Sequence, residues 1–216
     1  MRFSSEYFKK GFYDWKRELF EFKYLIILSL AIVVLAGYLD YVSGIYVSSK
    51  KGPDVPDLIL DHFGPYDMVL LFVYGYLVLV FLMFLYPMIF HIRMLHAVVS
   101  QFSMLVMIRS LFLIFTHLQT PSDAFSVRFP WVLQTLSFEN DMFFSGHTAI
   151  PFLAFLLFTG YWIRYVFLAG SLFMGITVLA MHIHYSIDVF SAFFITYCSW
   201  RMGNVIIEKA ENYIKS

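Results

Sequence analysis

Hydrophobic residues dominate six long stretches of the 216-residue chain, and polar residues gather between them. The stretches lie near residues 24–46, 66–91, 95–117, 148–166, 167–184 and 187–206. A helix of about 20 apolar residues crosses a hydrocarbon core of about 30 Å, and these stretches approach or exceed that length. The pattern therefore predicts an all-α fold, a polytopic membrane protein with six transmembrane helices.

The first 23 residues follow a different pattern, with large apolar side chains on one face of a helix and charges around much of the rest. The apolar positions recur at steps of three and four, as Phe8, Phe12, Trp15, Leu19 and Phe22. This spacing is typical of an amphipathic helix that lies in the membrane interface. We therefore predict a cytoplasmic interfacial helix over residues 1–23, a six-helix transmembrane domain over 24–208 and a cytoplasmic tail over 209–216.

Composition agrees with lipid as the main solvent of the chain. Apolar residues make up 60% of the sequence and charged residues only 14%, which leaves too little polar surface for a water-soluble exterior. The formal net charge is zero, so the charge balance gives no reason to expect a nucleic acid partner. A single cysteine, Cys198, excludes an intrachain disulfide framework and a multi-cysteine metal site.

Six spans place the two long polar connections, near 47–65 and 118–146, on one side of the membrane with the short turn at 184–188. Both termini and the other turns fall on the opposite side, which carries eleven of the fifteen Lys and Arg residues. The side of the long connections carries Lys50, Lys51 and Arg128. Because excess positive charge stays in the cytoplasm, we predict cytoplasmic termini. The long connections then face the periplasm, the cell exterior or an organelle lumen.

Two segments at the predicted membrane boundary carry residues that can do chemistry. Ser145-Gly146-His147 opens the fourth span, and His184 stands four positions before Asp188 in the turn between the fifth and sixth spans. Antiparallel threading brings both segments to one face of the membrane. Ionisable groups at this depth are costly, so their clustering predicts a functional site. On a helix, His184 and Asp188 share a face, where the carboxylate can orient the imidazole.

The order Ser-Gly-His and then His-x-x-x-Asp resembles the second and third motifs of the lipid phosphatase superfamily related to type 2 phosphatidic acid phosphatases. The resemblance is closer to its sphingomyelin synthase branch, whose four motifs are similar to four segments here in the same order. These segments are Val55-Pro56-Asp57-Leu58 with Asp61, Arg109 with Thr116, Leu118 and Pro121, Asp141 through Thr148, and His184 through Val189. The last two segments are the specific ones.

The chain departs from the sphingomyelin synthase pattern at two places. That branch usually has Pro after the Leu that aligns with Leu118, where this chain has Gln119. It also usually has Cys-Gly before the acidic residue, where this chain has Glu139 and Asn140 before Asp141. Both changes leave the catalytic residues intact, so they bear on the headgroup and on the acceptor.

The resemblance implies two successive transfers at one phosphorus atom. His184 would attack phosphorus and form a phosphohistidine, while His147 would protonate the departing lipid alkoxide and then deprotonate the acceptor. Asp188 would orient His184. The implied partners are a phospholipid donor and a lipid alcohol acceptor, ceramide-like or diacylglycerol-like. The scheme needs no metal ion and no organic cofactor.

Charge favours transfer over hydrolysis. The phosphatase pattern of the superfamily adds a Lys and an Arg-Pro in its first motif and an Arg shortly before the nucleophilic His. The six residues before His184 contain no Arg, which leaves Arg109 as the clear candidate for a phosphate-facing cation. One cation suits a phosphodiester monoanion better than a phosphomonoester dianion. We therefore predict a headgroup transferase. The alternatives are a lipid phosphatase that uses water and a non-catalytic lipid-binding or transport protein.

Acidic and aromatic residues near the motifs favour a cationic headgroup such as choline or ethanolamine. The acidic residues are Asp57, Asp61, Glu139 and Asp141, and the aromatic ones are Phe143, Phe144 and Tyr185. We assign substrate binding to Arg109, Asp141, Ser145, Asp57 and Tyr185. For Ser145 a hydrogen bond to phosphate or backbone is a better account than a nucleophilic serine, because no strand-turn-helix elbow surrounds it.

Ordinary structural roles stay open for the same residues. A boundary histidine such as His147 often hydrogen-bonds a backbone carbonyl, and Asp188 can cap the sixth helix. Arg109 can pair with an acidic residue or extend toward lipid headgroups. His182 stands two residues before His184, so on a helix the two point to nearly opposite sides and do not share a metal ion.

Overall fold

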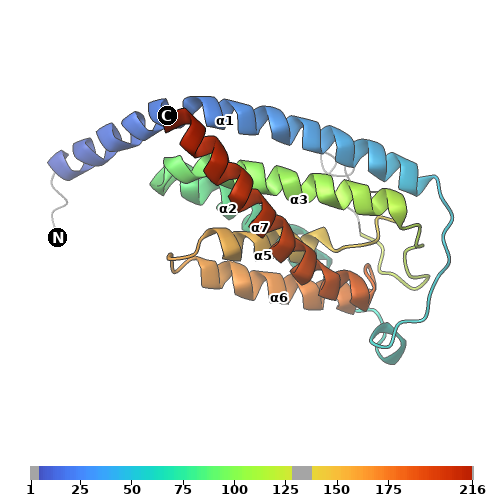
Figure 1. Ribbon diagram of the computed structural model, residues 1–216. Helices are drawn as coiled ribbons and strands as arrows, with labels where there is room; N and C mark the ends of the chain where they lie inside the picture. The colour runs from blue at the N-terminus through green and yellow to red at the C-terminus, as the bar shows by residue number, and fades with distance from the viewer. Residues whose placement is uncertain (1–4, 128–137, 216) are drawn as a thin grey trace.

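The computed structural model describes residues 5–127 and 138–215, and all regular elements in this part are helices (Figure 1). The elements are α1 (Ser5–Ser48), η1 (Leu60–His62), η2 (Leu71–Gly75), α2 (Tyr76–Phe90), η3 (Ile92–Met94), α3 (Leu95–Phe115), α5 (Gly146–Leu157), α6 (Arg164–Ala180) and α7 (Ser186–Lys215). The predicted all-α class is confirmed for the described part. Arg2 and Arg128, which the charge count used, lie outside the described residues, as do the side chains of 5–12.

Three helices in the described part are long and apolar enough to cross a membrane. They run over Tyr13–Ser48, Leu71–Phe90 and Ile92–Phe115. Large hydrophobic side chains on them are exposed, for example Val34 at 73% and Phe115 at 72%. Exposed apolar faces of this extent are expected where a protein meets lipid. These helices indicate a membrane protein.

The fourth and fifth predicted spans have different bounds in the structure. α5 has 12 residues and α6 has 17, so α5 extends about 18 Å, less than the hydrocarbon thickness. The predicted boundary at 166–167 is wrong, because α5 ends at Leu157 and a turn occupies residues 158–163. Gly160 lies in that turn at φ +96°, a left-handed conformation that glycine adopts at little cost.

The two predicted domain boundaries fall inside continuous helices. α1 is one helix of 44 residues that runs through the boundary at 23–24, and its N-terminal part extends beyond the other helices (Figure 1). Part of its predicted apolar face contacts protein, since Leu19 and Phe22 share a cluster with Leu95 at the start of α3. α7 likewise runs through the boundary at 208–209. The interfacial placement of the N-terminal segment stays a prediction.

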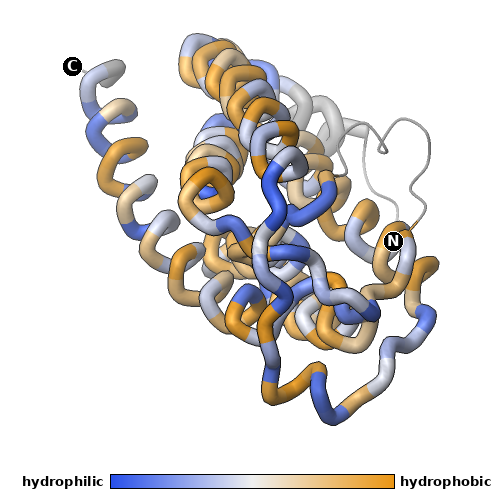
Figure 2. The backbone as a smooth tube through the Cα atoms, turned by 90° about the vertical axis from the view of Figure 1, so that its right-hand side faces the viewer, coloured by the Kyte–Doolittle hydropathy of each residue, from blue (hydrophilic) through white to orange (hydrophobic). Residues whose placement is uncertain are grey.

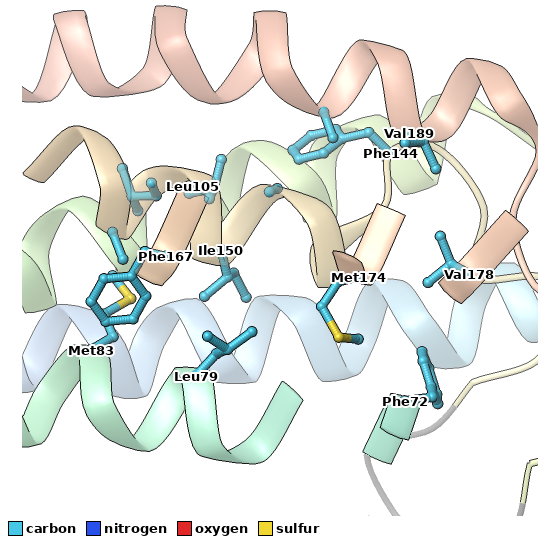
Figure 3. Packing of buried hydrophobic residues seen from close by; sticks show 14 of the residues in the cluster. Phe72, Leu79, Met83, Leu105, Phe144, Ile150, Phe167, Met174, Val178 and Val189 are labelled. Carbon is cyan, nitrogen blue, oxygen red and sulfur yellow. The ribbon is translucent and has the colours of Figure 1, made fainter. Parts of the chain in front are cut away.

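The main hydrophobic core lies among α2, α3, α5, α6 and α7 (Figure 3). Met83 of α2, Ile150 of α5, Phe167 and Met174 of α6, and Val189 of α7 are members of one buried cluster. All twelve residues of α5 are buried or half-buried. α5 is therefore fixed from several sides, and so is the histidine motif at its start.

The connections from α1 to η2 and from α3 to α5 lie at one end of the bundle, and the chain termini lie at the other (Figure 1). The Gln119 N–H donates to the Pro53 carbonyl oxygen at 3.2 Å and joins the two connections. Figure 2 views this end and shows hydrophilic residues gathered along the connections, whereas the helices are largely hydrophobic. The start of α5 and the turn from α6 to α7 reach the same end, so both histidine motifs lie at the end of the bundle where the connections lie.

Candidate active site

His184 and Asp188 meet where α7 begins. The structure corrects the predicted geometry, because His184 precedes the helix instead of sharing a helical face with Asp188. Asp188 lies in the first turn, where its Oδ2 accepts the backbone N–H of Tyr185, the residue before the helix, at 3.0 Å. A first-turn side chain that reaches back in this way forms one half of a capping box. The same oxygen lies 3.2 Å from His184 Nδ1, so the start of the helix sets the carboxylate against the imidazole.

The contact with Asp188 fixes which nitrogen of His184 can react. A carboxylate accepts hydrogen bonds and donates none, so Nδ1 carries the proton and Nε2 keeps a lone pair. Asp188 is 0% exposed and His184 4%, which strengthens their electrostatic interaction relative to water. An imidazole held in one tautomer by a buried carboxylate suits a nucleophile or a general base.

His147 lies in the first turn of α5 and faces the same space. Its ring centroid is 6.3 Å from that of His184 and 4.3 and 4.4 Å from the rings of Phe72 and Tyr76. Reacting atoms need separations of about 3–3.5 Å, so this spacing is compatible with one phosphorus group in contact with both imidazoles. His147 Nδ1 and Asp188 Oδ1 are buried without a hydrogen-bond partner in the part of the chain that the structure describes. Other buried atoms of the described residues also lack a partner, but these two belong to the two side chains on either side of His184, where a bound group could accept or donate their hydrogen bonds.

Ser145 joins the two histidine motifs through its backbone. Its N–H donates to the Asp188 carbonyl oxygen at 3.1 Å, which holds the start of α5 against the start of α7. The Ser145 side chain is fully buried, and its hydroxyl lies 3.4 Å from that of Thr148. The structure thus shows a positioning contact for Ser145, while the predicted contact with substrate stays a prediction.

Arg109 projects from α3 and is held by oxygen atoms of the protein. Its Nη2 pairs with Asp141, its Nη1 lies 3.4 Å from Asp40 Oδ1, and its Nε donates to the Phe144 carbonyl oxygen at 3.2 Å. A Cβ atom at Gly146 would lie 3.2 Å from Nε, so glycine gives the guanidinium room to pass. Two carboxylates already neutralise Arg109, and a phosphate contact would require it to exchange one of them.

Asp40 is the member of this network that our sequence reasoning did not assign. It lies on α1, where its carboxylate contacts Arg109 and the Ser110 hydroxyl, both at 3.4 Å. The available signal was an ionisable side chain inside the first apolar stretch, which by default marks a functional position with a partner. The identity of that partner depends on how α1 packs against α3.

Asp57, predicted to bind substrate, anchors the start of α7. Its Oδ2 accepts the backbone N–H and the hydroxyl of Ser186 at 2.7 and 2.8 Å, and its Oδ1 accepts the N–H groups of Ile59 and Leu60 at 2.9 and 3.2 Å. Partial burial acts to raise the pKa of Asp57, but the hydrogen bonds from Ser186, Ile59 and Leu60 together lower it below the ordinary 3.8. The carboxylate therefore stabilises the loop and the helix start that carries Asp188.

We expect Asp57→Asn to destabilise the protein at neutral pH and to flatten its stability below about pH 4. A lowered carboxyl pKa contributes stability above the ordinary value, and that contribution is lost as pH falls through the folded-state pKa. The amide would also set its NH₂ group against the Ser186 donors, at a cost of about 1–3 kcal/mol. Thermal unfolding in detergent from pH 7 to pH 3 measures both effects. Equal curves for the wild type and the variant would show that Asp57 is not an anchor.

Tyr185 joins the same two connections through its hydroxyl. The hydroxyl lies 2.9 Å from both Asp54 Oδ1 and the Gln119 carbonyl oxygen, and it accepts the Val55 N–H at 3.4 Å. Burial and the bond to Asp54 raise the pKa of Tyr185 to about 12. Hydrogen bonds from Ser122 and Tyr185 lower the pKa of Asp54. At neutral pH the phenol is therefore a donor and Asp54 an anion.

A cavity of about 590 Å³ lies at the end of the bundle where the connections meet, and its lining includes neither His147 nor His184. Its lining includes four carboxylates and, among the described residues, no lysine or arginine; the four are Asp54, Asp57, Asp61 and Asp123. Tyr185 lines the cavity and directly follows His184 in the chain. The lining attracts a cation and repels a phosphate dianion.

One of the three predicted aromatic residues, Tyr185, lines this cavity together with Phe63. Phe143 and Phe144 pack against Phe112 of α3, with ring centroids 5.7 and 6.2 Å from it. Phe144 is fully buried. A cation in the cavity would therefore meet the rings of Tyr185 and Phe63, and the contact of a headgroup with Phe143 and Phe144 stays a prediction.

Residues 140–205 match the PAP2 superfamily C-terminal family. The matched region contains His147, His184 and Asp188, the three side chains that the fold gathers. This match supports the PAP2 superfamily. Members of the PAP2 superfamily are generally phosphatases or phosphotransferases, so the match supports an enzyme of lipid phosphoryl chemistry and fits hydrolysis and transfer equally. No curated protein matches the chain.

Asn140 and Gln119 each make a defined contact between the two connections. Asn140 adopts φ +57°, a left-handed conformation that asparagine tolerates better than most residues. Its side chain bonds to Thr120 and Lys50 backbone groups at 3.1 Å each. The Gln119 N–H donates to the Pro53 carbonyl oxygen, which a proline at this position could not do. The two residues therefore hold the connections together.

His182 also has a defined contact outside the proposed chemistry. Its Nδ1 lies 2.8 Å from Asp123 Oδ2, and its residue adopts φ +54° after the end of α6. The helical argument that separated His182 from His184 does not apply, because both lie in the turn between α6 and α7. Within the described residues no group of three or more His, Cys, Asp or Glu has the geometry to hold a metal ion.

Proposed function

We propose that this chain transfers a phospho-headgroup from a glycerophospholipid to a ceramide-like or diacylglycerol-like alcohol through a phosphohistidine on His184. The observation that carries the proposal is the arrangement of three side chains from two helix starts. The rings of His147 and His184 lie 6.3 Å apart between centroids, and Asp188 lies 3.2 Å from His184 Nδ1. The PAP2 match supports phosphoryl chemistry at these residues.

In the first step, Nε2 of His184 attacks phosphorus and the bond from phosphorus to the glycerol oxygen breaks. His147, which carries a proton once the phosphate anion of the donor lies beside its ring, gives that proton to the departing diacylglycerol alkoxide. In the second step, neutral His147 takes the proton of the acceptor hydroxyl, whose oxygen attacks phosphorus and breaks the phosphorus–nitrogen bond. Asp188 stabilises the positive charge on the His184 ring. Both histidines then return to their initial protonation states.

The electrostatics of the site support transfer from a phosphodiester. Arg109 is committed to Asp40 and Asp141, so the site has little free positive charge to hold a phosphate dianion. The acidic cavity, which Tyr185 next to His184 in the chain helps to line, offers Asp54 and Tyr185 to a cationic headgroup. We propose choline or ethanolamine as the headgroup, and as the wider class a sphingomyelin synthase-like enzyme.

We also propose that α1, α2, α3, α6 and α7 each pass through the membrane and that α5, which is shorter than the hydrocarbon thickness, crosses together with the turn at 158–163, with the termini in the cytoplasm. α7 has 30 residues and a length of about 45 Å. Arg93 and Arg164 stand at the turns on the side of the termini, as cytoplasmic turns require. On this orientation the histidines face the periplasm, the cell exterior or an organelle lumen. A tag at the C-terminus that labels from outside intact cells would contradict it.

Purified protein in lipid nanodiscs, given headgroup-labelled phosphatidylcholine or phosphatidylethanolamine, tests the proposed function. With ceramide or diacylglycerol added as acceptor, we expect the label in a new phospholipid. Label released as a soluble phospho-headgroup or as phosphate would show that water is the acceptor. Binding of the donor without any product would support a non-catalytic lipid-binding protein. A preference for phosphatidylinositol would contradict the role of the acidic cavity.

A further inference from the structure

We propose that Asp40, on α1, is a positioning residue for this reaction, which acts through Arg109 to hold the segment that carries His147. The expected effect on kcat rests on the proposed function. The expected effect on the order of the segment before His147 rests on the contacts of Asp40 and Arg109 alone. Asp40 lies outside both histidine motifs, and its carboxylate contacts Arg109 and Ser110. Its effect on chemistry would therefore be indirect.

Arg109 contacts the segment before His147 at three residues. Its guanidinium pairs with Asp141 and donates to the Phe144 carbonyl oxygen, and it passes against the Cα of Gly146. These contacts cover six residues of chain that end directly before His147. The segment has no strand or long helix of its own to support it. The contacts with Arg109 therefore fix the position of the backbone where α5 begins.

Asp40 holds the guanidinium from the opposite side. The side chain of Arg109 is 12% exposed and that of Asp40 29%, so the pair is shielded from water and harder to replace by hydration than a surface pair. Both lie in helices long enough to span a membrane, where an unpaired charge is costly. The carboxylate of Asp40 thereby connects α1, through the Arg109 side chain of α3, to the segment 141–146 that precedes His147.

Removal of the Asp40 charge should loosen the segment and slow chemistry without weakening substrate binding. For Asp40→Asn we expect kcat to fall about 10-fold to 100-fold, the size of effect that a misplaced catalytic group produces, with KM changed less than about threefold. Asp40→Glu keeps the charge and should restore most of kcat. In an Arg109→Gln background the Asp40→Asn change should cost nothing further, because residues that act through one network are not additive.

Hydrogen exchange tests whether Asp40 and Arg109 order the segment before His147, and it does not require an active enzyme. We expect the amides of 141–148 to exchange about tenfold faster in Asp40→Asn than in the wild type, with those of α6 unchanged. Asp14→Asn is the matched control, since Asp14 pairs with Arg17 on the same helix far from the site, and it should alter neither kcat nor exchange. Unchanged exchange at 141–148 in Asp40→Asn would overturn the proposal even if the protein proved inactive. If exchange at 141–148 rises in Asp40→Asn as expected but the wild type transfers no headgroup, the proposed function is overturned and the positioning contact stands.

Discussion

His184→Ala is expected to abolish transfer, with a loss of at least about 10⁴-fold in kcat, because it removes the atom that bonds to phosphorus. The same loss is expected for hydrolysis, since both reactions pass through the phosphohistidine. The variant should still fold, because the ring contributes one contact to a helix start that Asp57 and Ser186 also hold. The measurement is the rate of labelled lipid formation at saturating donor and acceptor.

A matched control is His62→Gln. His62 is exposed in the connection at the same end of the bundle, where its ring bonds the Leu58 carbonyl oxygen. It should keep wild-type kcat. If His184→Ala retained more than a few per cent of the wild-type rate, the nucleophile would lie elsewhere.

His147→Ala should lower kcat by about 10²-fold to 10⁴-fold, the usual contribution of a general acid and base. Its role predicts an unequal effect on the two half-reactions. A donor whose leaving group is a nitrophenolate needs no proton to depart, so formation of the phosphohistidine should recover with that donor. Transfer to the acceptor should stay slow, because the acceptor hydroxyl still lacks its base.

Rapid quenching with the nitrophenyl donor resolves these steps, as a burst of nitrophenolate measures the first and labelled product the second. We expect the variant to give the burst and then almost no turnover. If His147→Ala formed the phosphohistidine as slowly as His184→Ala with both the nitrophenyl donor and the natural donor, His147 would not act as the acid. Loss of thermal stability equal to that of a core variant would instead indicate a packing role against Phe72 and Tyr76.

The histidine motifs could be recognised from the sequence because they depend on short spacings. Ser145 and His147 are two positions apart and His184 and Asp188 four positions apart, so local geometry brings each set together whatever the rest of the fold does. Hydropathy then placed both segments near the boundary of apolar stretches, and antiparallel threading placed them at one end. Those steps use only period and length.

The contacts between distant segments could not be predicted. Asp40, Arg109 and Asp141 are separated by 69 and 32 positions, and their meeting depends on how α1 and α3 pack. The turn at 158–163 escaped hydropathy because it includes Phe158, Trp162 and Ile163, which are as apolar as the helices on either side. The sequence pattern assigned Asp57 to substrate binding, since nothing local reveals that its carboxylate accepts hydrogen bonds from Ser186, 129 positions away.

The most direct test of the central claim is to trap the labelled headgroup on the protein. Wild-type enzyme mixed with labelled phosphatidylcholine in the absence of acceptor, quenched in alkali and digested, should yield one acid-labile phosphocholine adduct. The adduct should lie on the peptide that contains His184 and should disappear when ceramide or diacylglycerol is added before quenching. Steady turnover with no adduct, or an adduct on His147 or Ser145, would contradict the account.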